Sequence, residues 1–214
     1  MTPRPGGGRG GRSRVLSGTA ALFLAAAAAA LPGTGRAPAA ADGPRTLVEG
    51  ARLSVERAPR YDGSWVRLPY PGGDPGWAIG VCSDVVIRAF RHAGIDLQRL
   101  VHEDILAAPG AYRIVRPDPS IDHRRVANLA VFFRRHAETL PTARDWEPGD
   151  IVIWSLSGSG WPNHIGIVSD RRGPSGDPLV IHHFPRTARF SGRPEASDCL
   201  HTWRILHHFR WRWR

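Results

Sequence analysis

The sequence predicts an α+β domain in which helices come first and then pack on a short antiparallel sheet. Apolar residues recur at helical spacing between about residues 82 and 93. Pro148 and Gly149 then interrupt the chain, and the short runs that follow are rich in Ile and Val, which favours strands. A group of helices followed by a group of strands is typical of the α+β class.

Three helices are expected, in chain order. The run Pro69–Gly76 must be a loop because it is dense in proline and glycine. The first helix covers about 82–93 and ends at Gly94, a natural C-terminal cap. A second helix covers about 98–108, and a third runs from about 124 to 137. The apolar side of the third helix is formed by Val126, Leu129, Phe132 and Phe133.

The strands are expected in the second half of the chain. They are predicted at about 151–154, 164–169, 178–183 and 201–213. Short strands that follow one another in this way form an antiparallel sheet, on which the helices can bury their apolar sides.

The first 41 residues have the features of an export signal. A basic start without acidic residues is followed by the apolar stretch Ala20–Leu31 and by an A-x-A cleavage site at Ala39–Ala41. The apolar stretch is shorter than the roughly 20 residues that cross a bilayer. We expect cleavage after Ala41 and a periplasmic or extracellular protein, with an uncleaved amphipathic anchor as the alternative.

The predicted mature chain carries a smaller positive net charge than the full sequence. The formal net charge is +10, but five arginines lie in residues 1–41, so the mature chain carries only +5. This is weak evidence for nucleic-acid binding, and we expect no nucleic-acid partner. A modest positive charge suits a polyanionic surface such as a cell wall or an acidic membrane.

The remaining residues are enough for one domain with a single core. Residues 42–46 are expected to be a flexible lead-in, residues 47–210 the domain, and residues 211–214 a Trp/Arg tail. The alternating aromatic and cationic residues of the tail could bind an anionic membrane surface. They equally fit an edge strand with one packed and one charged face.

Cys82 is the candidate nucleophile. It begins the first predicted helix, where free backbone N–H groups and the helix dipole favour a thiolate, and its own N–H could face a developing oxyanion. The alternative is a buried structural cysteine, because free cysteine is among the most buried residue types. A disulfide between Cys82 and Cys199, which would abolish the nucleophile, is a further alternative for an exported protein.

Two later positions offer a base and a residue to orient it. His164 begins an alternating strand and shares a face with Gly166, which leaves space for a base that reaches Cys82. His182 and His183 point to opposite faces of the next strand, so at most one of them can orient His164. We choose His182 and keep His183 as the alternative. The order cysteine and then histidine suggests a papain-like thiol hydrolase.

Six segments closely resemble an uncharacterised bacterial family, domain of unknown function number 1287. They are Val66–Asp74, Gly80–Ala89, Leu100–Asp104, Ile121–Val126, Pro148–Val152 and His164–Asp170. The resemblance covers about residues 47–210. That family looks like a relative of the NlpC-type papain-like peptidases, which cut amide bonds in bacterial cell-wall peptides. The resemblance therefore implies a papain-like (NlpC-type) α+β fold.

The resemblance implies a role for each of three residues: Cys82 as nucleophile, His164 as general base and His182 as the residue that orients the base. It implies a thiol amidase or endopeptidase that acts on cell-wall peptides without a cofactor. One departure concerns the residue after His182, where relatives tend to have Asn and this chain has His183. A non-catalytic wall- or membrane-binding module is the alternative function. A zinc hydrolase using Cys82 and the two histidines is a more distant one, because the spacing matches no recognised ligand pattern.

Three further residues are candidates for the site. Arg124 and Arg125 open the third predicted helix and could bind a peptide carboxylate there. The alternative is that Asp122 caps the helix and the arginines are solvated. Tyr70 could form a hydrogen bond near the thiolate from its loop.

Overall fold

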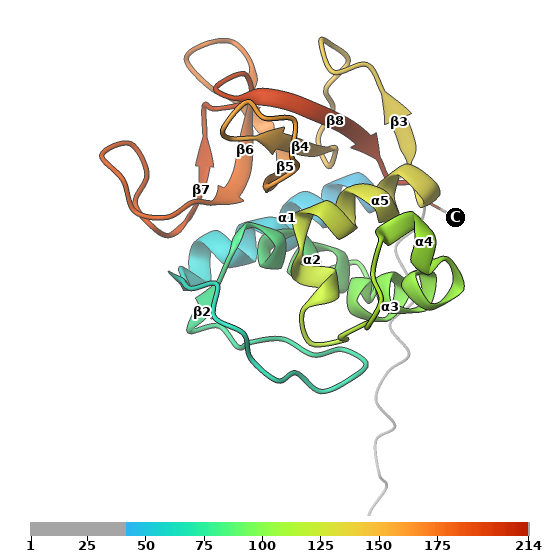
Figure 1. Ribbon diagram of the computed structural model, residues 1–214. Helices are drawn as coiled ribbons and strands as arrows, with labels where there is room; N and C mark the ends of the chain where they lie inside the picture. Colours follow the sequence, from blue (N-terminus) through green and yellow to red (C-terminus); the bar gives the residue numbers. More distant parts are fainter. Residues whose placement is uncertain (1–41, 214) are drawn as a thin grey trace, which may run out of the picture. The chain divides into compact units, whose positions relative to one another are not determined.

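The computed structural model describes residues 42–213, so the predicted signal peptide and Arg214 lie outside the described residues. The helices of this part are α1 (Gly43–Arg57), α2 (Cys82–His92), α3 (Leu97–Ala107), α4 (Pro109–Tyr112) and α5 (Val126–His136), with a 3-10 turn at Asp122–Arg124. The strands are β1 (Arg60–Tyr61), β2 (Ile79–Gly80), β3 (Glu138–Leu140), β4 (Ile151–Ser155), β5 (His164–Arg172), β6 (Pro178–His183), β7 (Pro194–Ser197) and β8 (Arg204–Arg210). The α+β prediction is confirmed, because helices precede the main sheet (Figure 1).

The main sheet has six strands in the order β3-β8-β4-β5-β6-β7, and all neighbouring strands are antiparallel. The short strands β1 and β2 pair separately and in parallel. Helices α1, α2 and α5 lie along one side of the main sheet (Figure 1), where α2 packs on β5 and β6. The three predicted helices and the four predicted strands are present, whereas the long helix α1 and the short elements β1, β2, β3, β7 and α4 were not expected.

The predicted flexible lead-in is wrong. Residues 43–46 form the first turn of α1, with Pro44 at a position where a helix tolerates proline. Farther along, Leu47, Val48 and Ala51 are buried against the core. The glycine and proline of this segment indicate a loop by composition, but the apolar face that follows them gives the segment a surface to bury.

Both faces of the sheet are buried, and this decides where the candidate residues lie. Side chains alternate along each strand. The helix-side face carries Ile153, Ile165, Ile167 and Ile181, which share a core with Cys82. The opposite face carries Val152, Trp154 and Val180, and these pack with Phe190, Cys199 and Leu200 from the loops and with Trp203.

The C-terminal tail packs on the protein. The ring of Trp211 lies 5.3 Å from that of Phe90 and 6.2 Å from that of Phe132, measured between centroids. The ring of Trp213 covers Gly43 so closely that a side chain at position 43 would collide with it. The sequence predicts a tail outside the domain of residues 47–210, but both tryptophan rings are partly buried against the helical core and so belong to the domain. Within residues 42–213, no helix is long and apolar enough to cross a membrane.

Candidate active site

Cys82 is the first residue of α2, as predicted, but its thiol is not activated in the predicted way. The residue is only 4% exposed. Burial raises the pKa of the thiol to about 12, although backbone N–H groups of Ile165 and Ser83 act in the opposite direction. The Asp84 carboxylate adds to the rise. The expectation of a low-pKa thiolate is corrected, because the cost of removing a charge from water exceeds the benefit of the helix start.

Asp84 anchors the beginning of α2. One of its oxygens accepts the N–H of Val81 at 2.8 Å, which caps the helix. Both oxygens accept N–H groups of Arg124, each at 2.8 Å, and the two side chains are 3% and 1% exposed. Arg124 therefore neutralises Asp84, and the prediction that it binds substrate is wrong. Arg125 is exposed and has no such partner among the described residues.

His183 is the histidine on the same sheet face as Cys82. It follows Ile181 by two positions in β6, and Ile181 shares the core with Cys82. Its ring meets that of Tyr61 edge to face, with centroids 4.9 Å apart. Burial, followed by the charges of Cys82 and Asp84, raises the pKa of Tyr61. Tyr61, Cys82, Asp84 and His183 thus belong to one neighbourhood.

The hydrogen bonding of His183 fixes its tautomer. Nε2 lies 3.2 Å from the carbonyl oxygen of Gly192, which can only accept, so Nε2 carries the proton. Nδ1 is buried and has no hydrogen-bond partner among the described residues. Burial lowers the pKa of His183, which keeps the ring neutral. A neutral ring with an unoccupied Nδ1 has the form that a general base requires.

His164 and His182 form a separate array on the opposite face. Nε2 of His164 lies 2.8 Å from Nδ1 of His182, and Nε2 of His182 lies 3.6 Å from Sγ of Cys199. The rings of Trp154 and Trp203 pack around His164. Burial lowers the pKa of His182 to about 3 and that of His164 well below its usual value. The array is therefore neutral, and its histidine–histidine contact is the one expected if His182 orients His164.

The predicted contact of His182 with His164 is present, and the side-chain alternation of β5 places His164 and Ile165 on opposite faces of the sheet. The predicted side-chain alternation is correct: His164 and Gly166 point to one face of the sheet, and His182 and Val180 point to one face as well. A Cβ added to Gly166 would lie 2.6 Å from Val180 and 3.3 Å from the Cβ of His182, so the glycine makes room for β6 and not for α2. Among the described residues no hydrogen bond joins the Cys82 thiol to a histidine ring.

The two cysteines and Tyr70 are also placed by the structure. Both cysteines are free and buried, and they belong to cores on opposite faces of the sheet, which rules against the disulfide alternative. The ring of Tyr70 lies 5.1 Å from that of His102, a residue of α3, and no described contact joins Tyr70 to Cys82. Residues 42–213 contain no cluster of three or more His, Cys, Asp or Glu side chains that could hold a metal ion.

Sequence reasoning missed Tyr61 and Asp84. Asp84 is the third residue of a helix, where an acidic side chain often caps the free N–H groups, and this position could have signalled its role. Tyr61 lies in a two-residue strand that carries no pattern of its own. Its nearness to His183 arises from the parallel pairing of β1 with β2, directly before Cys82.

Comparison with known proteins gives a family and a set of related chains. A family model described as "Domain of unknown function (DUF1287)" matches residues 48–211. The chain is 44% identical over 172 residues to "Uncharacterized protein YijF" of Escherichia coli (strain K12), which covers 77% of this chain and 80% of that protein. Two solved structures from Trichomonas vaginalis are similar, NlpC1 (15% identity, TM-score 0.45) and NlpC2 (16% identity, TM-score 0.44). Each similarity covers 81% of this chain but only 45% and 47% of those structures, so the chain spans less than half their length.

Proposed function

Because the chain belongs to the family described as Domain of unknown function (DUF1287), whose name assigns no activity, we propose its function from its own site. We propose that it is a thiol hydrolase of papain-like type that cleaves an amide bond. Cys82 is the nucleophile and His183 is the general base in this proposal. His183 therefore replaces His164 and His182, the pair implied by the family resemblance.

The proposal rests on the hydrogen bonding of the two ring nitrogens of His183. Its Nε2 donates a proton to the carbonyl oxygen of Gly192, while its Nδ1 is buried without a partner among the described residues. The ring lies on the sheet face against which Cys82 of α2 packs. Nδ1 of His102 and of His123 is also buried without a partner among the described residues, but of the three only His183 lies on the sheet face against which Cys82 packs.

The proposed reaction begins with a neutral pair, because the pKa of Cys82 is raised and that of His183 is lowered. Nδ1 of His183 takes the thiol proton as Sγ attacks the carbonyl carbon, and the backbone N–H of Cys82 stabilises the oxyanion. The imidazolium then protonates the leaving nitrogen, the C–N bond breaks, and a thioester remains. His183 next takes a proton from water, whose oxygen attacks the thioester. The C–S bond breaks, and Sγ regains its proton.

The proposed substrate is an amide of a cell-wall peptide. This part of the proposal rests on the predicted export signal and on the resemblance to wall peptidases. The predicted positive charge of the mature chain is compatible with a polyanionic wall.

A non-catalytic binding module is the second candidate, and one observation favours it. Cys82 is 4% exposed and its pKa is raised to about 12, as expected of a structural cysteine. Under this alternative the Cys82–His183 neighbourhood would only stabilise the fold.

Digestion of purified wall fragments by the mature chain tests the choice. Product masses identify the bond, and the Cys82→Ala variant is the matched control. The proposal expects new fragments with the wild type and none with the variant. No products from either protein would favour the binding module, and equal products from both would show that Cys82 is not the nucleophile.

A further inference from the structure

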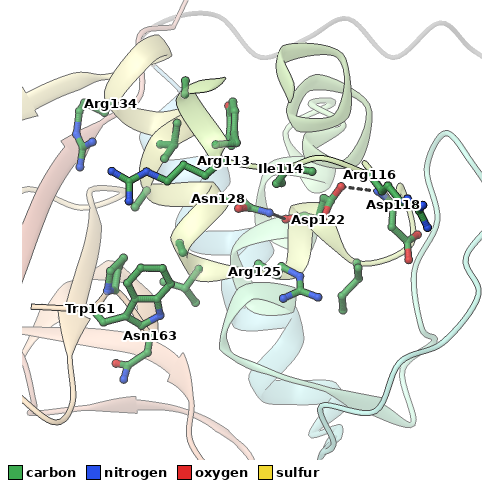
Figure 2. Close-up of a pocket in the computed structure, with 18 residues that line it drawn as sticks. Arg113, Ile114, Arg116, Asp118, Asp122, Arg125, Asn128, Arg134, Trp161 and Asn163 are labelled. Atoms are coloured by element: carbon green, nitrogen blue, oxygen red, sulfur yellow. Dashed lines mark hydrogen bonds between the residues drawn. The ribbon is translucent and has the colours of Figure 1, made fainter. Parts of the chain in front are cut away.

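A second candidate site lies in a groove that contains none of the residues of the proposed active site. Its volume is about 860 Å³, which is within the range of ligand sites. The groove is lined by the end of α4, the chain that follows it, one side of α5, and residues 161–163 (Figure 2). We define it by five of its lining residues and call it the arginine groove: Arg113, Arg116, Arg125, Arg134 and Trp161.

The arginines of the groove have few partners. Arg113, Arg116 and Arg125 are exposed, and none of them forms a side-chain hydrogen bond or ion pair with the described residues. Arg134 only shares a contact of 3.2 Å with the His207 ring. Elsewhere in the domain, arginines such as Arg88, Arg124 and Arg210 are held in ion pairs. The groove therefore gathers cationic groups that are available to a ligand.

The two carboxylates in the groove offset only part of the charge of its four arginines, and the charge of Asp122 interacts with that of Arg125. Asp118 accepts hydrogen bonds from the Trp65 ring N–H at 3.0 Å and from the Ser120 N–H at 2.8 Å. Asp122 accepts the backbone N–H of Asp118 at 2.6 Å, a contact drawn in Figure 2. Both carboxylates are thus used to shape the segment between α4 and α5, and the groove keeps a positive excess.

Trp161 forms the opposite wall of the groove. Its side chain is 65% exposed, which is unusual for such a large apolar ring. In Figure 2 it approaches from the strand side while Arg113 and Arg125 approach from the helical side. The neighbouring Asn163 holds its loop in place, because its side chain accepts the Leu156 N–H at 2.9 Å and its own N–H donates to Trp154.

From these observations we propose that the arginine groove binds an acidic peptide segment. Guanidinium groups match carboxylates in geometry and form charge-assisted hydrogen bonds with them. Ile114, Val131 and the Trp161 ring supply apolar surface for the carbon chain of a peptide, which a compact inorganic anion would leave unused. The arginines come from the end of α4, the segment that follows it and α5, and lie apart in Figure 2, which suits several carboxylates on one peptide.

The test is calorimetric titration of the mature Cys82→Ala protein with a short peptide of alternating Glu and Ala. This protein has no nucleophile, so binding does not depend on the proposed hydrolysis. The same peptide with Gln in place of Glu measures the contribution of the charges, and inorganic pyrophosphate and a short oligonucleotide measure other anions. Arg113→Gln and Arg125→Gln remove groove charges, while Arg171→Gln removes one exposed charge outside the groove.

The proposal predicts that the Glu peptide binds and that the Gln peptide binds at least about tenfold more weakly. Each groove variant should lose about fivefold or more in affinity, whereas Arg171→Gln should stay within about twofold. Trp161→Ala should also weaken binding while preserving its salt dependence. The proposal is overturned if Arg171→Gln weakens binding as much as the groove variants, or if the Glu peptide does not bind. It is also overturned if pyrophosphate or the oligonucleotide binds more tightly than the peptide.

Discussion

Nε2 of His164 lies 2.8 Å from Nδ1 of His182, on the face of the sheet opposite to Cys82. Adjacent residues of a strand point to opposite faces, so the next residue, His183, points toward the helices and Cys82. The sheet therefore separates two histidine sites that look continuous in the sequence. One is a buried array of His164, His182 and Cys199, and the other is the proposed active site.

Stability should fall in acid because His182 is buried in its neutral form. Its pKa is lowered from 6.5 to about 3, so between these values the unfolded chain binds a proton that the folded chain does not. The free energy of unfolding should be steady above about pH 6.5 and should decline as the pH falls toward 3. Urea unfolding across this range measures the slope. The His182→Gln variant should be less stable at pH 7 and show a shallower decline, whereas the exposed His201→Gln should match the wild type. A slope unchanged in His182→Gln would contradict this account.

Removing the Asp84 charge should be strongly destabilising. Asp84→Asn leaves Arg124 buried without its counter-charge, and such losses cost about 3–5 kcal/mol. Urea unfolding at pH 7 measures the change. Glu49→Gln is the matched control, because it breaks the exposed ion pair with Arg45, which should contribute less than about 1 kcal/mol. Equal effects from the two variants would show that the buried pair does not anchor α2.

Both cysteines should react slowly in the folded protein. Burial raises the pKa of Cys82 and of Cys199 to about 12, so neither thiolate is populated at neutral pH. We expect iodoacetamide to label neither residue appreciably at pH 6 to 8 and to label both once urea unfolds the chain. Peptide mass spectrometry reads both sites separately. Rapid, selective labelling of Cys82 at pH 6 would instead support the activated thiolate expected from its helix-start position.

Cutting the chain after Arg210 should destabilise the domain. Trp211 packs on Phe90 and Phe132, and Trp213 covers Gly43, so the cut exposes apolar surface at the start of α1 and on the helical core. Loss of two partly buried rings should cost about 2–4 kcal/mol. Thermal or urea unfolding measures it. Trp161→Ala removes an exposed ring and serves as the control, with little expected change. An unchanged stability after truncation would return the tail to the role of a surface-binding extension.

Much of this structure follows from local pattern. The helix that begins at Cys82, the helices α3 and α5, and the four longer strands are marked by apolar periodicity and by glycine or proline at their ends. The family resemblance is also confirmed, since the matched residues 48–211 nearly coincide with the predicted domain of 47–210.

The remaining features of the fold and of the candidate site depend on contacts between segments that are distant in the sequence. The alternation of β5 shows that His164 and Gly166 share a face, but it does not show which face meets α2, because both faces of the sheet are buried. The sequence favours His182 over His183 only weakly, because side-chain alternation is a poor guide at the end of a strand. Tyr61 reaches the site through a two-residue strand, and Trp213 stabilises α1 from the other end of the chain. Neither contact leaves a pattern in the sequence.

Turnover of a wall-peptide amide by three histidine variants tests the central claim most directly. The variants are His183→Ala, His164→Ala and His182→Ala, and the rate is divided by the folded fraction measured on the same sample. Removing a general base should lower the rate constant about 10²- to 10⁴-fold, so His183→Ala should show this loss per folded molecule, although removal of this buried ring also reduces stability. His164→Ala and His182→Ala should reduce stability but keep turnover per folded molecule within about tenfold of the wild type, since neither ring faces Cys82. Full turnover in His183→Ala, together with loss of turnover in folded His164→Ala, would contradict the account and assign the base to the opposite face of the sheet.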